Sequence, residues 1–486
     1  MALVLIGFMG AGKSTLARRL AEQRGRTPLD SDTLLAERFG HSVAREFELH
    51  GEQSFRAAEE ELVCRVLSAA GTRDVIALGG GSVLSERVRA ARDEHVTVLV
   101  DVDPALAWER VRGDDGAERP LARDRAAFDA LYAERRGLYE QAADAWLLWA
   151  ESASGDYPVF VGRGLLNDER LASVWPLDRA ASRPFCITDE TVGALYLERL
   201  GALAASIAIP PGESHKTLAT AELVWRELAH AEMTRADHLV ALGGGVVGDL
   251  AGFCAATYQR GVPVVQVPTT LVAQVDSAYG GKTGVDLPEA KNYVGAYHQP
   301  AAVLVDPDAL GTLPEAELNA GWVEVLKTAL IAGGELWERV AAEELLDERT
   351  ILACARLKLA VVAEDERDAG RRQVLNLGHT VGHAIETATG YARYRHGEAV
   401  GLGLLAALRL SGREELRAQV RELLLARRLP VTLQGCDVEQ VVRAVAHDKK
   451  RLAGPTPFVL LDAPGEVRVG CAVPEKELRA AVAELG

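Results

Sequence analysis

The chain has 486 residues, of which 48% are hydrophobic and 26% are charged, and its formal net charge is −16 at pH 7. This length exceeds what one hydrophobic core usually supports, so we expect two or three domains. The composition is typical of a globular protein and excludes a disordered chain. The acidic balance argues against general binding to nucleic acids or anionic membranes, because both require a basic face.

The N-terminal sequence "MALVLIGFMGAGK" is apolar but has no basic residue before its apolar run. We therefore interpret it as a buried first strand and not as a signal peptide. No apolar run approaches the length of a membrane span. The six cysteines show no CxxC spacing, which favours a reducing compartment. These features indicate a soluble cytoplasmic protein, and its expected partners are small-molecule substrates.

From residue 1 to about residue 150, short β-rich runs alternate with helical stretches, an order typical of a parallel sheet built from βαβ units. The first run leads into "GFMGAGKS", which fits the GxxxxGKS pattern from Gly7 to Ser14. Between a strand and a helix, this pattern predicts a phosphate loop in which Lys13 reaches the transferred phosphoryl group and the Ser14 hydroxyl binds magnesium. The expected ATP-binding residues are Gly10, Ala11, Gly12, Lys13, Ser14 and Thr15.

Further segments of this block point to the acceptor: "DSD", "SFRAAEEE", "ALGGG", "ERPLA" and "ERRGLYEQAAD" follow one another along the chain. In this order they resemble the shikimate kinases over essentially all of the first 150 residues. The resemblance implies that Asp32 binds a ring hydroxyl and accepts its proton, and that Arg56 and Arg135 hold the acceptor carboxylate. It also implies that backbone at Gly80 lies against the ring and that Arg119, in the lid, stabilises phosphate charge and contacts ATP.

Isolated arginines more often form surface ion pairs, which is the alternative for Arg56 and Arg135. A gluconate or adenylate kinase would keep the phosphate loop but lose this set of segments. One half of the chain is alternatively a degenerate, non-catalytic module fused to an active partner.

The segment "ESASGDYP" at 151–158 is small, polar and turn-forming, so it is the best candidate for a linker. A second α/β block follows it, and after Leu313 the β signals give way to helical patterns. We expect a P-loop kinase parallel-sheet domain at 1–153, a Rossmann-like NAD-binding α/β domain at 154–312 and a mostly helical domain at 313–486.

The second block repeats the letters ALGGG, but its neighbours do not match those of the first copy, so the chain contains no duplication. "GGGVVGD" fits GxGxxG, which is a weak dinucleotide signal by itself. With "PGESHK" before it and "VPTTLVAQVDSAYGGKTGVDLPEAKN" after it, the run resembles the 3-dehydroquinate synthases from about Tyr157 to the C-terminus. The resemblance implies that NAD binds to Glu213, Lys216, Gly245, Val246, Val247, Gly248, Asp249, Thr269, Thr270, Lys282, Lys291 and Thr312. Asp286 stands where the family commonly has asparagine.

The same resemblance implies a basic cluster for a phosphorylated sugar acid, which an acidic chain would not otherwise attract. Each lysine by itself is typical of a solvated surface, and Lys449 fits that alternative equally well. Two of the lysines, Lys282 and Lys327, are also expected to act in catalysis. The implied substrate-binding residues are Arg260, Asp276, Lys282, Asn292, Lys327, Lys358, Arg372, Asn376 and Lys449.

Histidine spacing and family resemblance give different answers for the metal. "NLGHTVGHAIE" places His379 and His383 on one face of a helix, and that spacing alone suggests that both bind zinc. The resemblance instead implies Glu324, His379 and His396 as ligands, with His383 handling a proton on the substrate side. We follow the resemblance, because two nitrogens and a carboxylate leave a position open for substrate oxygens. The ligand set accepts zinc or cobalt.

Together the two resemblances imply a bifunctional enzyme. One half would phosphorylate shikimate with ATP and magnesium, giving shikimate 3-phosphate. The other would convert 3-deoxy-D-arabino-heptulosonate 7-phosphate to 3-dehydroquinate with NAD and zinc, eliminating phosphate. Another sugar phosphate cyclase and a zinc-dependent glycerol-type dehydrogenase are the alternatives for the second half. No motif encodes the oligomeric state, although the resemblance favours a homodimer through the synthase half.

Overall fold

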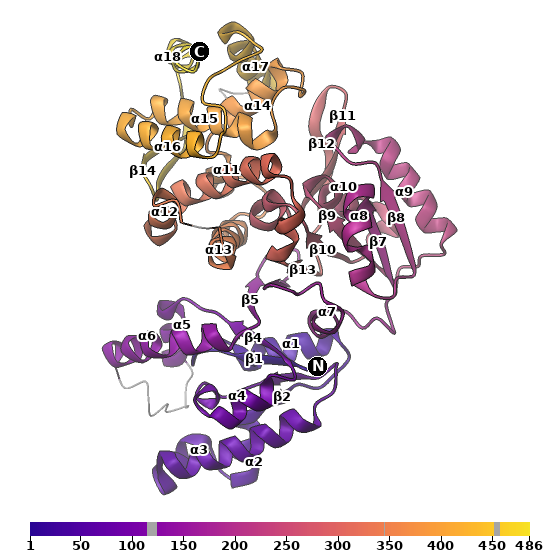
Figure 1. Ribbon diagram of the computed structural model, residues 1–486, viewed down its shortest axis with the longest axis vertical. Helices are drawn as coiled ribbons and strands as arrows, with labels where there is room; N and C mark the ends of the chain where they lie inside the picture. The colour runs from indigo at the N-terminus through magenta and orange to yellow at the C-terminus, as the bar shows by residue number, and fades with distance from the viewer. Residues whose placement is uncertain (114–123, 345, 452–456) are drawn as a thin grey trace.

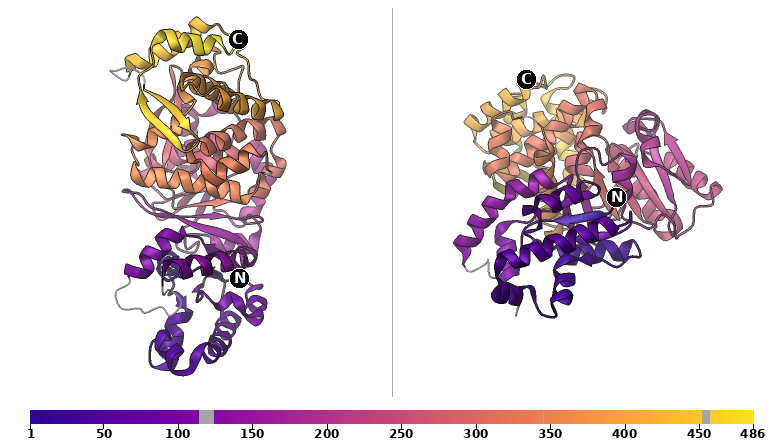
Figure 2. Two further views of the ribbon diagram at one scale, coloured as in Figure 1. Left: turned by 90° about the vertical axis from the view of Figure 1, so that its left-hand side faces the viewer. Right: turned by 60° about the horizontal axis from the view of Figure 1, so that its bottom comes forward.

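The computed structural model describes residues 1–113, 124–344, 346–451 and 457–486, and it describes their side chains except at positions 168 and 447–451. The first 150 residues form one lobe, and the rest of the chain forms a sheet lobe and a helical lobe beside each other above it (Figures 1 and 2). Among the described residues, no helix combines the length and the apolarity that a membrane crossing requires. The architecture expected from the sequence is confirmed: a P-loop parallel-sheet part, a Rossmann-like part and a helical part.

The N-terminal lobe alternates strands and helices as the sequence predicts. Its central strands, at Leu3–Ile6, Val75–Ala77 and Val96–Val100, are short apolar runs that are buried along their whole length, as parallel strands covered on both faces must be. Its elements are β1 (Leu3–Ile6), α1 (Lys13–Gln23), β2 (Leu29–Asp30), α2 (Ser31–Phe39), α3 (Val43–Ala69), β3 (Val75–Ala77), α4 (Glu86–Arg92), β4 (Val96–Val100), α5 (Pro104–Gly113), α6 (Arg125–Ala142) and β5 (Ala145–Ala150).

The middle part has the same alternation and adds a hairpin, β11–β12, that stands beyond the sheet towards the helical lobe (Figure 1). Its elements are β6 (Tyr157–Val161), α7 (Asp168–Val174), β7 (Pro184–Asp189), α8 (Glu190–Tyr196), β8 (Ala205–Ile209), α9 (Leu218–His230), β9 (His238–Gly243), α10 (Gly245–Thr257), β10 (Val264–Pro268), β11 (Lys282–Leu287), β12 (Ala290–Tyr297) and β13 (Ala302–Val305).

Eleven strands of the described chain form one continuous sheet in the order β2-β3-β1-β4-β5-β6-β13-β10-β9-β7-β8. The assigned pairings within each half are parallel, whereas β5 and β6 pair in antiparallel fashion from Trp146↔Val161 to Ala150↔Tyr157. The two α/β blocks therefore share a sheet, and the strands on either side of the expected linker form the hairpin that joins them.

The β5–β6 hairpin is buried on both faces. Leu148, Tyr157 and Val159 face the core of the helical lobe, while Leu147 and Phe160 belong to a core that the N-terminal and middle parts build together. Because successive side chains of a strand point to opposite faces, each strand of the hairpin contributes to both cores. The hairpin is therefore an internal element of the molecule.

Residues 151–156, within the expected linker, form the turn of this hairpin. Arg19 of α1 pairs with Asp156 at 2.9 Å, and the backbone N–H of Ser154 donates to the Glu366 carboxylate at 3.2 Å. The turn is thus held on one side by the N-terminal lobe and on the other by the helical lobe.

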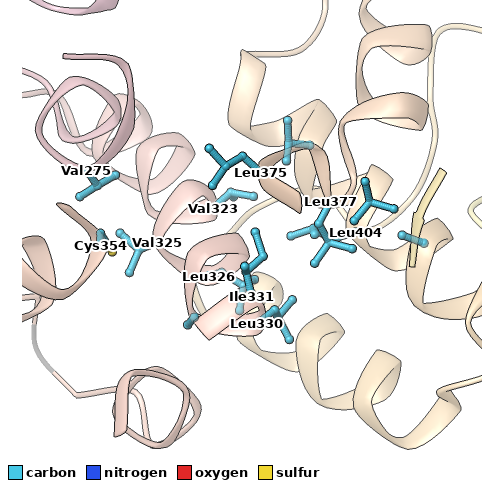
Figure 3. Packing of buried hydrophobic residues seen from close by; sticks show 14 of the residues in the cluster. Val275, Val323, Val325, Leu326, Leu330, Ile331, Cys354, Leu375, Leu377 and Leu404 are labelled. Carbon is cyan, nitrogen blue, oxygen red and sulfur yellow. The ribbon is translucent and has the colours of Figure 1, made fainter. Parts of the chain in front are cut away.

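The helical lobe is built around α11, which is buried on nearly every face from Ala320 to Ile331. Figure 3 shows its side chains Val323, Leu326 and Leu330 packed among apolar neighbours such as Leu377. A helix that is apolar all round belongs at the centre of a bundle. The elements are α11 (Glu315–Ala332), α12 (Gly334–Ala341), α13 (Glu348–Glu364), α14 (His379–Ala388), α15 (His396–Leu410), α16 (Glu414–Ala426), α17 (Val438–Arg451), β14 (Phe458–Ala463), β15 (Glu466–Cys471) and α18 (Glu475–Ala483).

Candidate functional sites

The phosphate loop lies between β1 and α1, as the motif requires. Gly10 and Gly12 adopt left-handed backbone with φ of 77° and 90°, and a Cβ on Gly10 would lie 2.4 Å from a backbone oxygen of α5. Lys13 begins α1, and its Nζ donates to the carbonyl oxygens of Gly7 at 2.9 Å and Phe8 at 3.1 Å. Ala11, Ser14 and Thr15 complete the loop and the first turn, so a helix N-terminus faces the site where an anion is favoured.

The arginines expected to hold the acceptor converge beside this loop. Tyr139 of α6 donates its hydroxyl hydrogen to the Gly80 carbonyl. Burial raises the pKa of Tyr139, and the nearby guanidinium groups of Arg135 and Arg56 oppose the shift. An added Cβ on Gly80 would lie 3.6 Å from the Gly7 carbonyl oxygen and 3.7 Å from the Tyr139 hydroxyl, so this glycine lies between the phosphate loop and Tyr139.

A side chain at either glycine beside Gly80 would displace a residue of the expected site. A Cβ on Gly79 would lie 2.7 Å from Oδ1 of Asp32, and one on Gly81 would overlap the Arg56 guanidinium. Arg56 is held by Glu59 of its own helix, with Nη1 2.6 Å from Oε2. The structure therefore gathers Asp32, Arg56, Gly80 and Arg135 beside the phosphate loop. Arg119 lies outside the described residues.

The second glycine turn connects β9 to α10. A Cβ on Gly243 would lie 2.6 Å from Val247, and one on Gly244 would lie 2.7 Å from Thr270. The backbone can make this turn only without side chains, and α10 then begins at Gly245 with its N-terminus open to a ligand.

Three carboxylates surround the buried Lys216 near this turn: Glu213 at 2.8 Å, Asp249 at 3.3 Å and Asp286 at 3.8 Å. Burial lowers the pKa of Lys216, but Asp249 and Glu213 outweigh it and raise that pKa overall. Burial also raises the pKa of Asp249 to about 6, against the opposing effect of Lys216. Lys216 already has two carboxylate partners, Glu213 and Asp249, and Asp286 adds a third.

A cleft of about 1570 Å³ runs between the sheet lobe and the helical lobe and brings most of the expected residues together. From the NAD set it is lined by Glu213, Lys216, Gly245, Val246, Val247, Asp249, Thr270, Lys282 and Lys291, and from the substrate and metal sets by Asp276, Asn292, Glu324, Lys327, Lys358, Arg372, Asn376, His379, His383 and His396.

Some expected residues do not line this cleft. Thr312 lies with its hydroxyl 2.6 Å from that of Tyr196, Thr269 is buried, and an added Cβ on Gly248 would lie 3.0 Å from Gln266. Arg260 ends a short turn after α10 with φ of 70°. The side chain of Lys449 lies outside the described residues.

Asp276 is the centre of the basic cluster in the cleft. It accepts from Lys327 Nζ at 2.9 Å and from Lys358 Nζ. Burial by itself would raise the pKa of Asp276, but the two ammonium groups lower it to about 2. Arg372 donates to the Gly280 carbonyl at 3.0 Å and is almost completely buried. The two lysines on Asp276 and the Arg372 guanidinium line the same cleft, and such a group of cations suits an anion.

Glu324 and three histidines meet on the helical side of the cleft. Oε1 of Glu324, on α11, lies 3.7 Å from Nε2 of His379 and 3.4 Å from Nε2 of His396. The ring nitrogens of His379, His383 and His396 also include a set within 4.8 Å of one another. The structure therefore brings both candidate ligand sets together and does not choose between them.

The donor set fits a divalent metal. In the described part of the chain, neither carboxylate oxygen of Glu324 accepts a hydrogen bond of normal geometry, although Lys327 Nζ lies 2.5 Å from Oε2. Burial lowers the pKa of His379 to about 3, which keeps its imidazole neutral at physiological pH. Burial also lowers the pKa of His396, but the Glu324 and Glu386 carboxylates outweigh it and raise that pKa to about 10, so that ring must release a proton when it binds a metal. A neutral imidazole and an ionised, buried carboxylate are the forms that bind zinc.

Sequence reasoning missed one residue of this site, Glu386. Its Oε2 lies 3.5 Å from Nδ1 of His396, and its Oε1 accepts from Lys291 Nζ at 3.2 Å. The sequence feature that could have identified Glu386 is its position in "HAIE", where it follows His383 by about one helical turn on α14.

Comparison with known proteins places these sites in families. Residues 206–320 and 321–451 match the family models for the N-terminal and C-terminal parts of 3-dehydroquinate synthase. The 3-dehydroquinate synthase of Halorhodospira halophila is 44% identical over 339 residues, which cover 66% of this chain and 94% of that protein. The enzyme of Enterococcus faecalis is 42% identical, with 63% and 90% covered. The chain belongs to the 3-dehydroquinate synthase family.

The N-terminal lobe matches a different family, since residues 9–156 fit the model for shikimate kinase. The chain therefore joins a shikimate kinase domain to a 3-dehydroquinate synthase part and is a fusion of two shikimate-pathway enzymes, one of the kinase class and one of the lyase class. A solved structure similar to the synthase part is 2-epi-5-epi-valiolone synthase from Streptomyces hygroscopicus subsp. jinggangensis, with NAD+ and Zn2+ bound. It is 28% identical, its TM-score is 0.61, and 68% of this chain and 96% of that chain are covered.

Proposed function

We propose that the chain catalyses two steps, the ATP- and magnesium-dependent phosphorylation of shikimate to shikimate 3-phosphate and the conversion of 3-deoxy-D-arabino-heptulosonate 7-phosphate to 3-dehydroquinate. We further propose domains at 1–153, 154–312 and 313–486 and a homodimer through the synthase half. The observation that carries the first step is the glycine loop at 79–81, in which Gly80 lies against the Gly7 carbonyl oxygen of the phosphate loop and Gly81 lies against the Arg56 guanidinium.

In the kinase site, each group has a separate task. Lys13 would follow the transferred phosphoryl group, and Ser14 would hold magnesium against the phosphates. Arg56 and Arg135 would bind the acceptor carboxylate, since two guanidinium groups match its planar shape. Asp32, beside Gly79, would take the proton from the attacking hydroxyl.

The cleft carries the proposal for the second step, because its walls hold the glycine turn on one side and the basic cluster and Glu324–histidine group on the other. When bound, NAD would supply reversible oxidation of a substrate hydroxyl, and zinc or cobalt would polarise its oxygen. Glu324, His379 and His396 would hold the metal. Lys327, Lys358 and Arg372 would bind the acidic groups of the substrate, while Lys282 and His383 would move protons.

The resemblance to 2-epi-5-epi-valiolone synthase supports a second candidate for the synthase half, another sugar phosphate cyclase. The two candidates differ in the ring that the cleft accepts, so they predict different substrates for the same cofactors. Turnover of other sugar phosphates at a higher kcat/KM than 3-deoxy-D-arabino-heptulosonate 7-phosphate would favour this second candidate.

The test assays both steps on the intact purified chain. Lys13→Ala removes the charge that follows the phosphoryl group, so kinase turnover should fall by at least about a hundredfold while synthase turnover stays unchanged. His396→Ala should decrease synthase turnover and leave kinase turnover unchanged, so each variant is the control for the other. Parallel loss of both activities in either variant would contradict the assignment of two separate sites.

The metal content of two variants distinguishes the ligand sets. We expect His396→Ala to lose bound zinc after mild chelation, and His383→Ala to keep nearly stoichiometric zinc and lose turnover. If zinc is instead lost from the His383 variant and kept by the His396 variant, the helical pair His379 and His383 forms the site.

A further inference from the structure

His396 presents its two ring nitrogens to two different carboxylates. Nε2 lies 3.4 Å from Oε1 of Glu324, on the proposed metal side, and Nδ1 lies 3.5 Å from Oε2 of Glu386. An imidazole that binds a metal through one nitrogen carries its hydrogen on the other, and the partner of that N–H fixes the tautomer and the orientation of the ring. Glu386 occupies the partner position.

The two proposed histidine ligands are oriented in different ways. His379 has Nδ1 3.2 Å from the carbonyl oxygen of Leu377, two residues before it in the chain. His396 begins α15, so the N-terminus of that helix positions its backbone, while the side chain of Glu386 on α14 reaches its ring. Of these two rings, that of His396 therefore has a replaceable side chain facing its Nδ1, whereas that of His379 has a backbone carbonyl.

Glu386 also connects the metal site to the other wall of the cleft. The carboxylate is 3% exposed, so its ionised form needs cationic or N–H partners. Its second oxygen accepts from Lys291, on strand β12, at 3.2 Å, and the Lys291 ammonium lies 4.6 Å from the centre of the Tyr391 ring. This hydrogen bond therefore joins hairpin β11–β12 to helix α14.

We propose that Glu386 is a positioning residue of the synthase site. It fixes the ring of His396 for metal binding, and through Lys291 it ties the metal site to the NAD-side hairpin. This inference rests on the proposed ligand set of Glu324, His379 and His396. A consequence is reciprocal coupling, since a tie that favours one arrangement for both sites makes zinc and NAD each strengthen binding of the other.

The decisive measurement is the zinc affinity of Glu386 variants by chelator competition, with the full chain and without turnover. Glu386→Ala should bind zinc about 10- to 100-fold more weakly, the usual effect of losing an outer partner of a histidine ligand. Glu386→Gln should recover much of this loss, because its amide oxygen still accepts from Nδ1–H. Cobalt-substituted Glu386→Ala should also show a changed visible spectrum, which a general loss of stability would not produce.

Lys291→Met provides the matched control. It removes the other partner of the carboxylate and leaves Glu386 beside His396, so zinc affinity should change far less than in Glu386→Ala. The gain in NAD affinity on adding zinc should shrink in both variants. Wild-type zinc affinity in Glu386→Ala, with zinc lost in His396→Ala, would overturn the role of Glu386 and leave the ligand set intact. If His396→Ala keeps its zinc, both the role of Glu386 and the proposed ligand set are wrong.

Discussion

At the scale of single residues, His238 begins strand β9 with its imidazole fully buried. Its Nδ1 lies 2.8 Å from the Ser182 hydroxyl, and its Nε2 has no hydrogen-bond partner among the described residues. Burial lowers the pKa of His238 to about 4, and Arg179 adds to the shift. The folded state therefore holds this side chain neutral where the unfolded chain would protonate it.

This residue should make stability depend on pH. An unfolded histidine titrates near about 6.5, so between that value and about 4 the unfolded state binds more protons, and stability rises with pH. Lowering the pH from 7.5 to 5 should cost about 2 kcal/mol through this group. Denaturant unfolding of His238→Asn at both pH values should show a smaller decrease than wild type. An identical decrease in both proteins would mean that His238 does not carry the effect.

At the scale of elements, helix α15 begins in very close contact with α11. A Cβ on Gly397 would overlap the backbone carbonyl of Ala320, which lies one helical turn before Glu324. The spacing between the two helices therefore also sets the spacing between Glu324 and His396. At Gly401, one turn further along α15, an added Cβ would lie 3.3 Å from the flexible Leu424 side chain and 3.8 Å from Val323 Cγ1, which is ordinary contact.

Gly397→Ala should therefore separate two proposed metal ligands without touching either. We expect a loss of about 1–3 kcal/mol in stability from overpacking and a clear decrease in zinc affinity, measured by thermal unfolding with and without zinc. Gly401→Ala is the control and should change both quantities little. Equal effects of the two substitutions would show that the Gly397 contact does not set the ligand spacing.

The elements carrying local motifs were predictable, because a phosphate loop or a glycine turn is defined by residues next to each other in the chain. The pair of His379 and His383 was predictable for the same reason. Glu386 was missed because its partner Lys291 is 95 residues away. Spacing within α14 also carries no information about Glu324 and His396, which approach the same place from α11 and α15.

The pairing of β5 with β6 could not be predicted from the sequence, for a different reason. Residues 151–156 are polar and small, a composition that suits a linker and a hairpin turn equally well. What distinguishes them is the run "AWLLWA" just before, whose apolar side chains need cover on both faces. Hairpin β14–β15, with Pro-Gly at its turn, shows that strands also occur beyond Leu313, where the sequence suggests mostly helices.

At the scale of the whole molecule, the kinase and synthase parts share a sheet and a core. Helix α13 adds contacts between the halves, with Arg349 2.8 Å from Glu140 and an ion pair between Arg356 and Asp101. Cutting the chain within 151–156 and producing the halves separately would expose the edges of β5 and β6 and the apolar side chains around them.

We expect the separate fragments 1–153 and 154–486 to aggregate or self-associate, because an exposed apolar edge strand pairs readily with other chains. Co-expression should restore a complex with both activities, observed by size-exclusion chromatography. Cleavage at a protease site inserted in the turn of the folded protein is the control and should leave the halves together. Two monodisperse, fully active fragments would show that the shared sheet is dispensable.

The continuous sheet also has a consequence for the nascent chain on the ribosome. β5 and β6 are joined by a short turn, so the hairpin forms as soon as both strands have emerged, before the rest of the synthase exists. The other edge of β6 pairs with β13, where Val303 aligns with Val159. This second pairing can form only after β13, which is far along the chain, has been synthesised. During synthesis we therefore expect the finished kinase sheet to act as the template that holds the first synthase strand in register.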